Sequence, residues 1–130
     1  MVLVDTNIIG ELARKGPNQG VVLWSRTVGE IVLSAITVEE IAFGLSLHPN
    51  ARVEEWFSRF MESAVSVLPV TLEISHLAGT LRGRLAASGE VRSQADMLIA
   101  ATAQIHRLNL VTRNPRDFSH CGISVFNPFS

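Results

Sequence analysis

The chain has 130 residues, 47% of them hydrophobic, and a formal net charge of −1 at pH 7. This length suits one domain, residues 1–130, with a sizeable core, and the apolar fraction excludes a disordered tail. The near-neutral charge gives no global attraction to nucleic acid, so any phosphate binding must come from a local patch.

No segment of the sequence predicts a membrane or secretory protein. No apolar run approaches the roughly 18 residues that a transmembrane helix needs. The chain begins directly with an apolar run, without a charged region or a cleavage site, so we expect no signal peptide. The single Cys121 cannot form an internal disulfide and fits a reducing compartment. These features together predict a cytoplasmic protein with no membrane partner.

Strand-like and helix-like patterns alternate along the chain. The first strand ends on Asp5, and Asn7 is expected to cap the helix after it. Thr37 and Ser93 are expected to open two later helices, and Asn114 to cap a helical turn that starts at Pro115. In chain order, we predict a strand at 1–5, helices at 7–14 and 21–26, a strand at 31–35, helices at 37–47 and 53–64, a strand at 65–70, helices at 71–88 and 93–108, a strand at 109–112, a helical turn at 114–117 and a strand at 123–126.

Two of these segments carry more specific expectations. Pro69 places the third strand at an edge of the sheet, because proline cannot donate to a strand ladder. The helix at 53–64 has the strongest apolar stripe in the chain, which we interpret as core or dimer contacts. The stripe consists of Val53, Trp56, Phe57, Phe60, Met61 and Ala64.

The alternation of strands and helices predicts an α/β fold with a largely parallel sheet covered on both faces. In such folds, functional sites form beyond the carboxyl ends of the strands. Asp5 and residues 112–114 lie at such ends in this interpretation, and residues 37–40 follow another one closely.

Four acids are the candidates for chemistry. The chain contains only three Asp residues, at 5, 96 and 117, and Glu40 is the fourth candidate. Carboxylates gathered in one site raise each other's pKa, so such a cluster is costly without a cation. Oxygen ligands without a Cys or His pattern suit Mg²⁺ or Mn²⁺, which could activate water on a phosphodiester.

Helix capping is the competing interpretation of these acids. Glu40, Asp96 and Asp117 each come three residues after a Thr, Ser or Asn, the spacing of a helix start. A carboxylate there gains about 0.3–1 kcal/mol from the helix dipole without any metal. Spacing alone leaves both interpretations open, although Asp5 ends a buried strand and is harder to explain by capping alone.

Four segments resemble, in order, the motifs of PIN-domain ribonucleases. They are VLVDTN at 2–7, LSAITVEE at 33–40, ADMLIAATA at 95–103 and LVTRNPRDF at 110–118, and FNPF at 126–129 adds to the likeness. The likeness runs over nearly the whole chain and is greatest to VapC-type toxins of bacterial toxin–antitoxin pairs, including the FitB-like branch. One departure is Met97, which follows Asp96 where relatives often carry a small residue.

The resemblance implies a three-layer α/β/α sandwich and a metal-dependent endoribonuclease that uses Mg²⁺ or Mn²⁺. Carried over by position, Asp5 and Asp96 would be the main metal ligands. Glu40 and Asp117 would bind the ion directly or through water, or position the attacking water. The resemblance further implies an antitoxin that blocks the site, a homodimer, and contact with DNA only through the antitoxin. The residues that would orient carboxylates or water are Asn7, Thr112 and Asn114.

Arginines beside the predicted site are candidates for RNA phosphate contacts. Arg113 and Arg116 flank the predicted cleft, and Arg82, Arg84 and Arg92 are further candidates. Two other functions stay open: a non-catalytic binding module with the same fold, and an acid-based phosphotransfer or phosphatase domain. The second needs a paired Asp-x-Asp or a well-placed Lys, whereas this chain has Asn7 at the second position.

Overall fold

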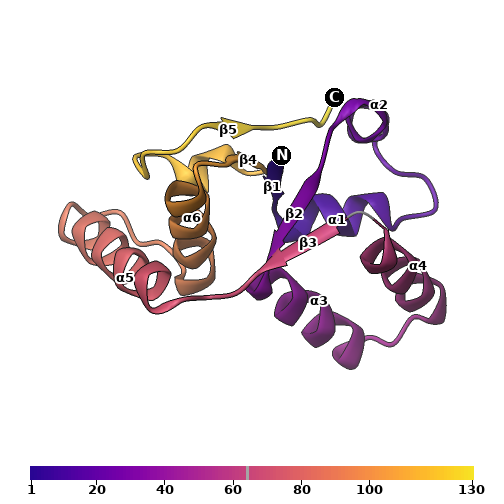
Figure 1. The fold of residues 1–130 in the computed structure, drawn as a ribbon, viewed down its shortest axis with the longest axis horizontal. Helices are drawn as coiled ribbons and strands as arrows, with labels where there is room; N and C mark the ends of the chain where they lie inside the picture. Colours follow the sequence, from indigo (N-terminus) through magenta and orange to yellow (C-terminus); the bar gives the residue numbers. More distant parts are fainter. Residues whose placement is uncertain (64) are drawn as a thin grey trace.

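Five parallel strands form one sheet with the first strand at its centre. The computed structural model describes residues 1–63 and 65–130. The order across the sheet is β3-β2-β1-β4-β5, and every neighbouring pair is parallel (Figure 1). This confirms the parallel sheet, the central first strand and the edge position of the third. The strands are β1 (Val2–Val4), β2 (Ile31–Ser34), β3 (Val65–Leu68), β4 (Asn109–Val111) and β5 (Val125–Phe126).

Helices cover both faces of the sheet, which gives the predicted three-layer α/β/α arrangement. In Figure 1, α5 and α6 lie on one side of the strands, and α1 to α4 lie on the other. The helices are α1 (Thr6–Leu12), α2 (Gln19–Thr27), α3 (Ala35–Leu47), α4 (Ala51–Glu62), α5 (Leu72–Ala87) and α6 (Gln94–His106), followed by the 3₁₀ turn η1 (Pro115–Phe118).

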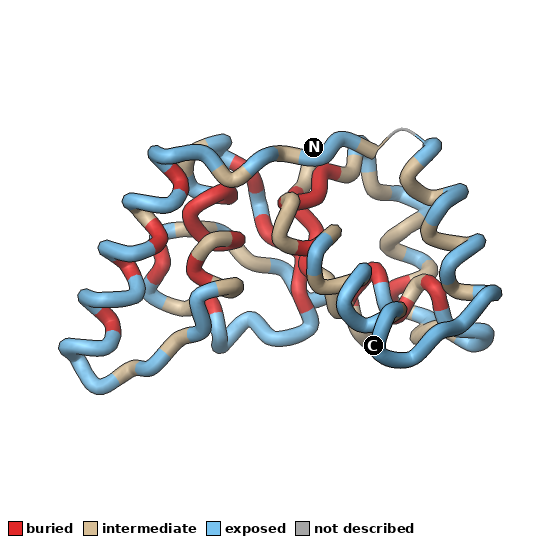
Figure 2. Tube along the Cα trace, turned by 90° about the horizontal axis from the view of Figure 1, so that it is seen from below, coloured by how far each residue is buried: buried red, intermediate tan, exposed pale blue. Residues whose placement is uncertain are grey.

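Alternating residues of the strands belong to two separate cores. Leu3 packs with α5 and α6, whereas Val4 packs with Ile8 and Ile9 of α1. Because successive strand side chains point to opposite faces, one short apolar strand serves both cores. Figure 2 shows the buried segments in the strands and on the inner sides of the helices.

Two of the predicted α-helix caps are wrong. Asp5, rather than Asn7, caps α1, and its carboxylate accepts from Thr6 N at 2.8 Å. Ser34, rather than Thr37, caps α3 and accepts from Ile36 N at 3.0 Å. The helix α3 begins directly after β2, and only Asp5 separates α1 from β1. The predicted cap at Ser93 is confirmed, since its hydroxyl accepts from Asp96 N at 3.0 Å.

The apolar stripe of α4 packs against the second core without being fully buried. Trp56 and Phe60 stack with their ring centroids 5.1 Å apart, and both contact that core. The prediction of core contacts is therefore confirmed for Trp56, Phe57, Phe60 and Met61. Ala64, predicted to end it, lies outside the described residues. Within residues 1–63 and 65–130, no helix combines the length and apolarity that a membrane crossing requires.

Candidate active site

The candidate site lies where β1, β2 and β4 end and α1, α3 and α6 begin. Asp5 directly follows β1, Thr112 follows β4, and Glu40 lies in the second turn of α3. Asp96 is in the first turn of α6. The parallel register of β1 with β4 brings Asp5 beside Thr112, although 107 residues separate them in sequence.

Asp5 is the most firmly fixed acid of the site. Its side chain is only 6% exposed. One carboxylate oxygen, Oδ1, accepts from Thr6 N at 2.8 Å. The other, Oδ2, accepts from Thr112 Oγ1 at 2.7 Å and from Asn7 Nδ2 at 3.1 Å. Burial raises the pKa of Asp5, these hydrogen bonds oppose that rise, and the charge of Asp117 adds to it.

The Glu40 carboxylate is oriented by threonine hydroxyls to which the sequence motifs gave no role in the site. Thr6 Oγ1 donates to Glu40 Oε1 at 2.7 Å, and Thr6 and Thr37 bring their hydroxyls within 3.2 Å of each other. Thr37 is fully buried within α3, where its hydroxyl contacts that of Thr6, and it does not cap the helix. The sequence held one signal for the role of Thr6, which is that Thr6 directly follows Asp5 in the first motif.

Asp96 feels the charge of all three other candidate acids. Its pKa is raised from 3.8 to about 6. Burial is the largest cause, the negative charges of Asp5, Asp117 and Glu40 raise it further, and the Ser93 hydroxyl partly opposes the rise. The other three acids chosen from the sequence therefore all lie within electrostatic range of Asp96.

Asp117 lies in η1 on the exposed rim of the site. Its backbone N–H donates to the carbonyl of Asn114 at 3.1 Å, and its own carbonyl accepts from Arg92 Nη1 at 2.7 Å. The Asn114 side chain makes no capping bond, which corrects that prediction, because the turn closes through the backbone alone. Asn114 N donates instead to Thr112 Oγ1 at 3.1 Å.

Arg92 stabilises η1 and the segment after it. Its side chain is only 9% exposed, and it donates to the carbonyl of Asp117 and to Ser119 Oγ. Arg113 and Arg116, in contrast, are both exposed at the rim. Arg113 also connects to the site through its backbone, since its N–H donates to Asn7 Oδ1 at 3.1 Å.

The donor set consists of carboxylates and hydroxyls. These oxygen ligands fit a hard divalent cation such as Mg²⁺ or Mn²⁺ better than a soft metal. In the part of the chain that the structure describes, no three His, Cys, Asp or Glu side chains stand close enough together to hold one ion. The arrangement nevertheless concentrates negative charge at the carboxyl ends of the strands, where a cation would offset the repulsion between the carboxylates.

Comparisons with known proteins agree with this geometry. The family model described as PIN domain matches residues 2–123. The chain is 34% identical to the VapC ribonuclease Y4jK of Sinorhizobium fredii, over 99% of this chain and 98% of that protein. It is 33% identical to the toxin FitB of Neisseria gonorrhoeae, over 99% of both chains.

The fold also matches solved toxin–antitoxin structures. The structure of FitAB bound to an IR36 DNA fragment superposes with a TM-score of 0.86 and 32% identity, covering 100% of this chain and 96% of that one. The crystal structure of FitAcB from Neisseria gonorrhoeae gives a TM-score of 0.85. The chain therefore belongs to the PIN domain family, in the branch that contains the VapC and FitB toxins.

Proposed function

We propose that this chain is the endoribonuclease toxin of a bacterial toxin–antitoxin pair, and that it hydrolyses RNA phosphodiester bonds in the cytoplasm with Mg²⁺ or Mn²⁺. Two kinds of evidence support this. The VapC relatives are named ribonucleases, and the candidate site gathers four acids at the carboxyl end of a parallel sheet.

The observation that carries the proposal is the placement of the acids at the carboxyl end of the sheet: Asp5 follows β1, Glu40 lies on α3, and Asp96 lies in the first turn of α6. The electrostatics agree with this placement, because capping alone would lower the pKa of Asp96, since a helix N-terminus favours the ionised carboxylate. Instead burial and the charges of Asp5, Asp117 and Glu40 raise it to about 6. Such repulsion is unfavourable in the ion-free protein, and it is the arrangement that a divalent cation relieves.

The residues divide into ion-binding and orienting groups. Asp5 and Asp96 would hold the ion, with Glu40 and Asp117 binding directly or through water. A bound ion of this kind activates water and neutralises charge on the phosphodiester. Thr112 and Asn7 fix the Asp5 carboxylate, and Thr6 fixes that of Glu40. Asn114 contributes through its backbone N–H rather than its side chain.

A cleavage assay on single-stranded RNA tests this assignment. Asp96→Asn and Glu40→Gln should each lower the cleavage rate by at least about tenfold, since even outer groups at metal sites matter this much. Glu39→Gln is the matched control, because Glu39 is the exposed neighbour of Glu40 on α3. Cleavage that survives a chelator, or that both variants retain, would contradict the proposal.

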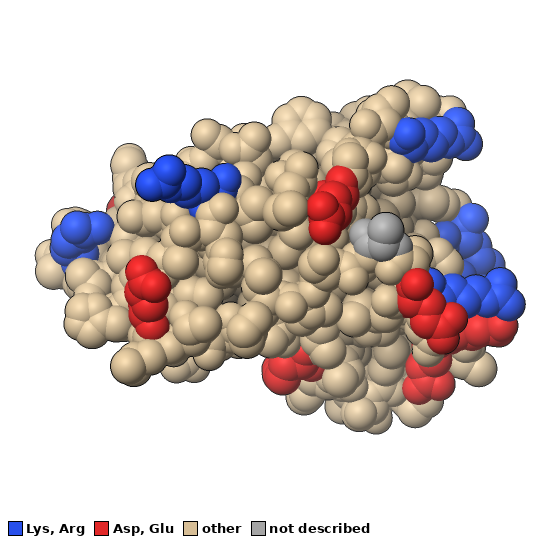
Figure 3. All heavy atoms as spheres, viewed as in Figure 1, with Lys and Arg blue, Asp and Glu red and all other residues tan. Residues whose placement is uncertain are grey.

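We further propose that Arg113 and Arg116 bind RNA phosphates. On the face shown in Figure 3, basic and acidic side chains are interspersed, so this face offers no broad basic surface. A few arginines at the rim then supply the contacts. Each Arg→Ala change should weaken RNA binding and reduce its salt slope by about one unit. An unchanged slope in both variants would place the contacts elsewhere.

Partner proteins form the last part of the proposal: a cognate antitoxin that inhibits the enzyme, and a second copy of the chain. Apolar side chains at the surface support protein partners, since Phe43 and Leu47 of α3 are 64% and 60% exposed. The FitAB structure is bound to an IR36 DNA fragment, and the VapBC structures from Rickettsia felis and Salmonella typhimurium are also bound to DNA. We assign DNA contact to the antitoxin alone. Co-purification with the product of a neighbouring gene, followed by light scattering, tests both partners.

A further inference from the structure

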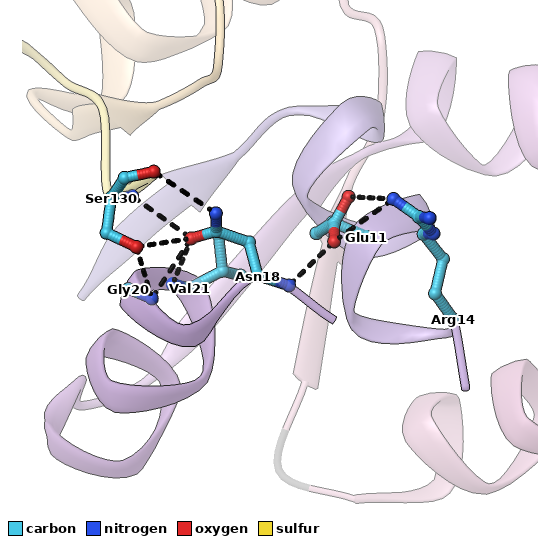
Figure 4. Close-up of polar contacts among 6 residues, drawn as sticks. All are labelled: Glu11, Arg14, Asn18, Gly20, Val21 and Ser130. Atoms are coloured by element: carbon cyan, nitrogen blue, oxygen red, sulfur yellow. Dashed lines mark hydrogen bonds and ion pairs between the residues drawn. The ribbon is translucent and has the colours of Figure 1, made fainter. Parts of the chain in front are cut away.

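The segment after β5 crosses the molecule and ends against the start of α2. We call residues 127–130 the tail. Asn18, the cap of α2, accepts at Oδ1 from Ser130 N at 3.0 Å, and its Nδ2 donates to Ser130 O at 3.3 Å (Figure 4). Gly20 N donates to Ser130 Oγ at 3.2 Å. These bonds join residues more than 100 positions apart.

Gly20 lets the tail approach α2 closely. A Cβ at this position would lie 2.4 Å from the carbonyl oxygen of Pro128, which only a glycine avoids. Pro128 is buried, and Phe129 is half-buried against the second core. The tail is therefore a packed part of the fold with a defined path.

Before it reaches α2, the tail passes Arg113, beside the candidate site. The guanidinium carbon of Arg113 lies 4.6 Å from the centroid of the Phe129 ring. Asn127 Nδ2 donates to the carbonyl of Arg113 at 3.3 Å, and Asn127 Oδ1 accepts from Phe129 N at 3.0 Å. The tail thus contacts both the side chain and the backbone of one arginine. That arginine is also bound to Asn7 through its N–H.

We propose that Asn127 and Phe129 are positioning residues that hold Arg113 for an RNA phosphate. This inference rests on the proposed function. An exposed arginine loses rotamer freedom when it binds an anion. The Phe129 ring restricts that freedom in advance, and Asn127 fixes the backbone from which the side chain extends. A cation–π contact at an exposed site corresponds to roughly a twofold to fivefold change in an equilibrium constant.

The test compares ring and non-ring side chains at position 129. Phe129→Leu keeps apolar packing but removes the ring, and it should weaken binding of a single-stranded RNA oligonucleotide roughly twofold to fivefold. Phe129→Tyr keeps the ring and should restore binding. Phe126→Leu is the matched control, because Phe126 belongs to β5 and is 52% exposed. Binding is measured by fluorescence anisotropy in the Asp96→Asn background, so that the RNA stays intact.

A double-mutant cycle shows whether the effect passes through Arg113. If Phe129 acts by holding Arg113, the double variant Phe129→Leu/Arg113→Ala binds no more weakly than Arg113→Ala alone. Fully additive losses, or parent-like binding by Phe129→Leu, would overturn the inference. Should Phe129→Leu fail to fold, Asn127→Ala takes its place in the cycle and must show the same non-additive loss.

The cycle also separates this inference from the proposed function. If Arg113→Ala weakens binding and Phe129→Leu does not, only the positioning role fails. If Arg113→Ala has no effect, the positioning role fails as well, and the Asp96 dependence of RNA cleavage decides separately whether the chain is a metal-dependent ribonuclease.

Discussion

Replacing Asp96 by Asn should make the ion-free protein more stable at neutral pH. The change keeps the shape of the side chain and removes one of four mutually repelling charges. In the parent, burial and the charges of Asp5, Asp117 and Glu40 raise the Asp96 pKa from 3.8 to about 6. A carboxyl that is easier to protonate in the folded than in the unfolded chain disfavours folding once it is ionised.

The structure sets the size of this effect. A pKa displaced from 3.8 to about 6 corresponds to at most about 3 kcal/mol at pH 7. Asp96 is only half-buried, and solvent screening reduces the expected gain to about 1 kcal/mol. For a chain of this length, the midpoint of thermal unfolding should rise by roughly 3–5 °C.

The pH dependence has a definite sign. The protonated Asp96 carboxyl contributes stability that is fully present below pH 3.8 and is lost as the pH rises through about 6. The advantage of Asp96→Asn should therefore be largest above pH 6 and shrink toward pH 4. Melting curves of both proteins in chelator, at pH 7.5, 6.0 and 4.5, measure it.

One result would refute the reasoning. If Asp96 mainly capped α6, Asp96→Asn would lower stability by about 0.3–1 kcal/mol at pH 7.5, because a favourable dipole contact is lost. A lower melting midpoint at pH 7.5 with little change at pH 4.5 would show this. The acids would then not repel one another as their placement indicates.

Three further predictions follow from other contacts. Mg²⁺ at a hundredfold excess over its Kd should stabilise the parent by about 2.7 kcal/mol and Asp5→Asn much less, and an equal response in melting curves would exclude Asp5 as a ligand. Burial raises the pKa of Glu11, but the hydrogen bond from Asn18 N and the contact with Arg14 together lower it below its ordinary value. Glu11→Gln should therefore lower the free energy of unfolding by about 1 kcal/mol at pH 7. Urea titrations should show this difference narrowing below pH 4.5, and a constant difference would mean that charge is irrelevant. Gly20→Ala should cost about 1–3 kcal/mol in the same titrations, because its Cβ would meet the Pro128 carbonyl, and parent-like stability would mean that the tail can move aside.

Local sequence patterns predicted the sheet and most helices, because caps, strand breaks and apolar periodicity all depend on residues that are close together in the sequence. Ser93 caps α6 as its spacing indicated, and Pro69 follows an edge strand. The errors at Asn7 and Thr37 have one cause: each strand–helix junction offers more than one short polar residue that could cap the helix, Asp5 before Asn7 and Ser34 before Thr37. Which residue caps the helix depends on where the pairing with the neighbouring strand ends. Asp5 is still part of that pairing, because Asp5 N donates to Val111 O at 2.9 Å.

The resemblance named Asn7 and Thr112 as residues that would orient carboxylates, and both donate to Asp5 in the structure. It did not name Thr6, which donates to Glu40 across 34 residues, and the four acids themselves stay a prediction. No local periodicity encodes such pairs. The contact of Phe129 with Arg113 is of the same kind, because it depends on the path of the tail over α2.

The central position of β1 has a consequence for biosynthesis. β1 is translated first, yet its partner β4 lies 107 residues later, at Asn109–Val111. The nascent chain can pair β1 with β2 early, but Asp5 meets Thr112 only when that residue has left the ribosome. Such non-local pairing makes folding slow relative to local helix formation. A ribosome-bound chain that has not reached Thr112 therefore cannot fix the Asp5 carboxylate, so the candidate site can form only late in synthesis.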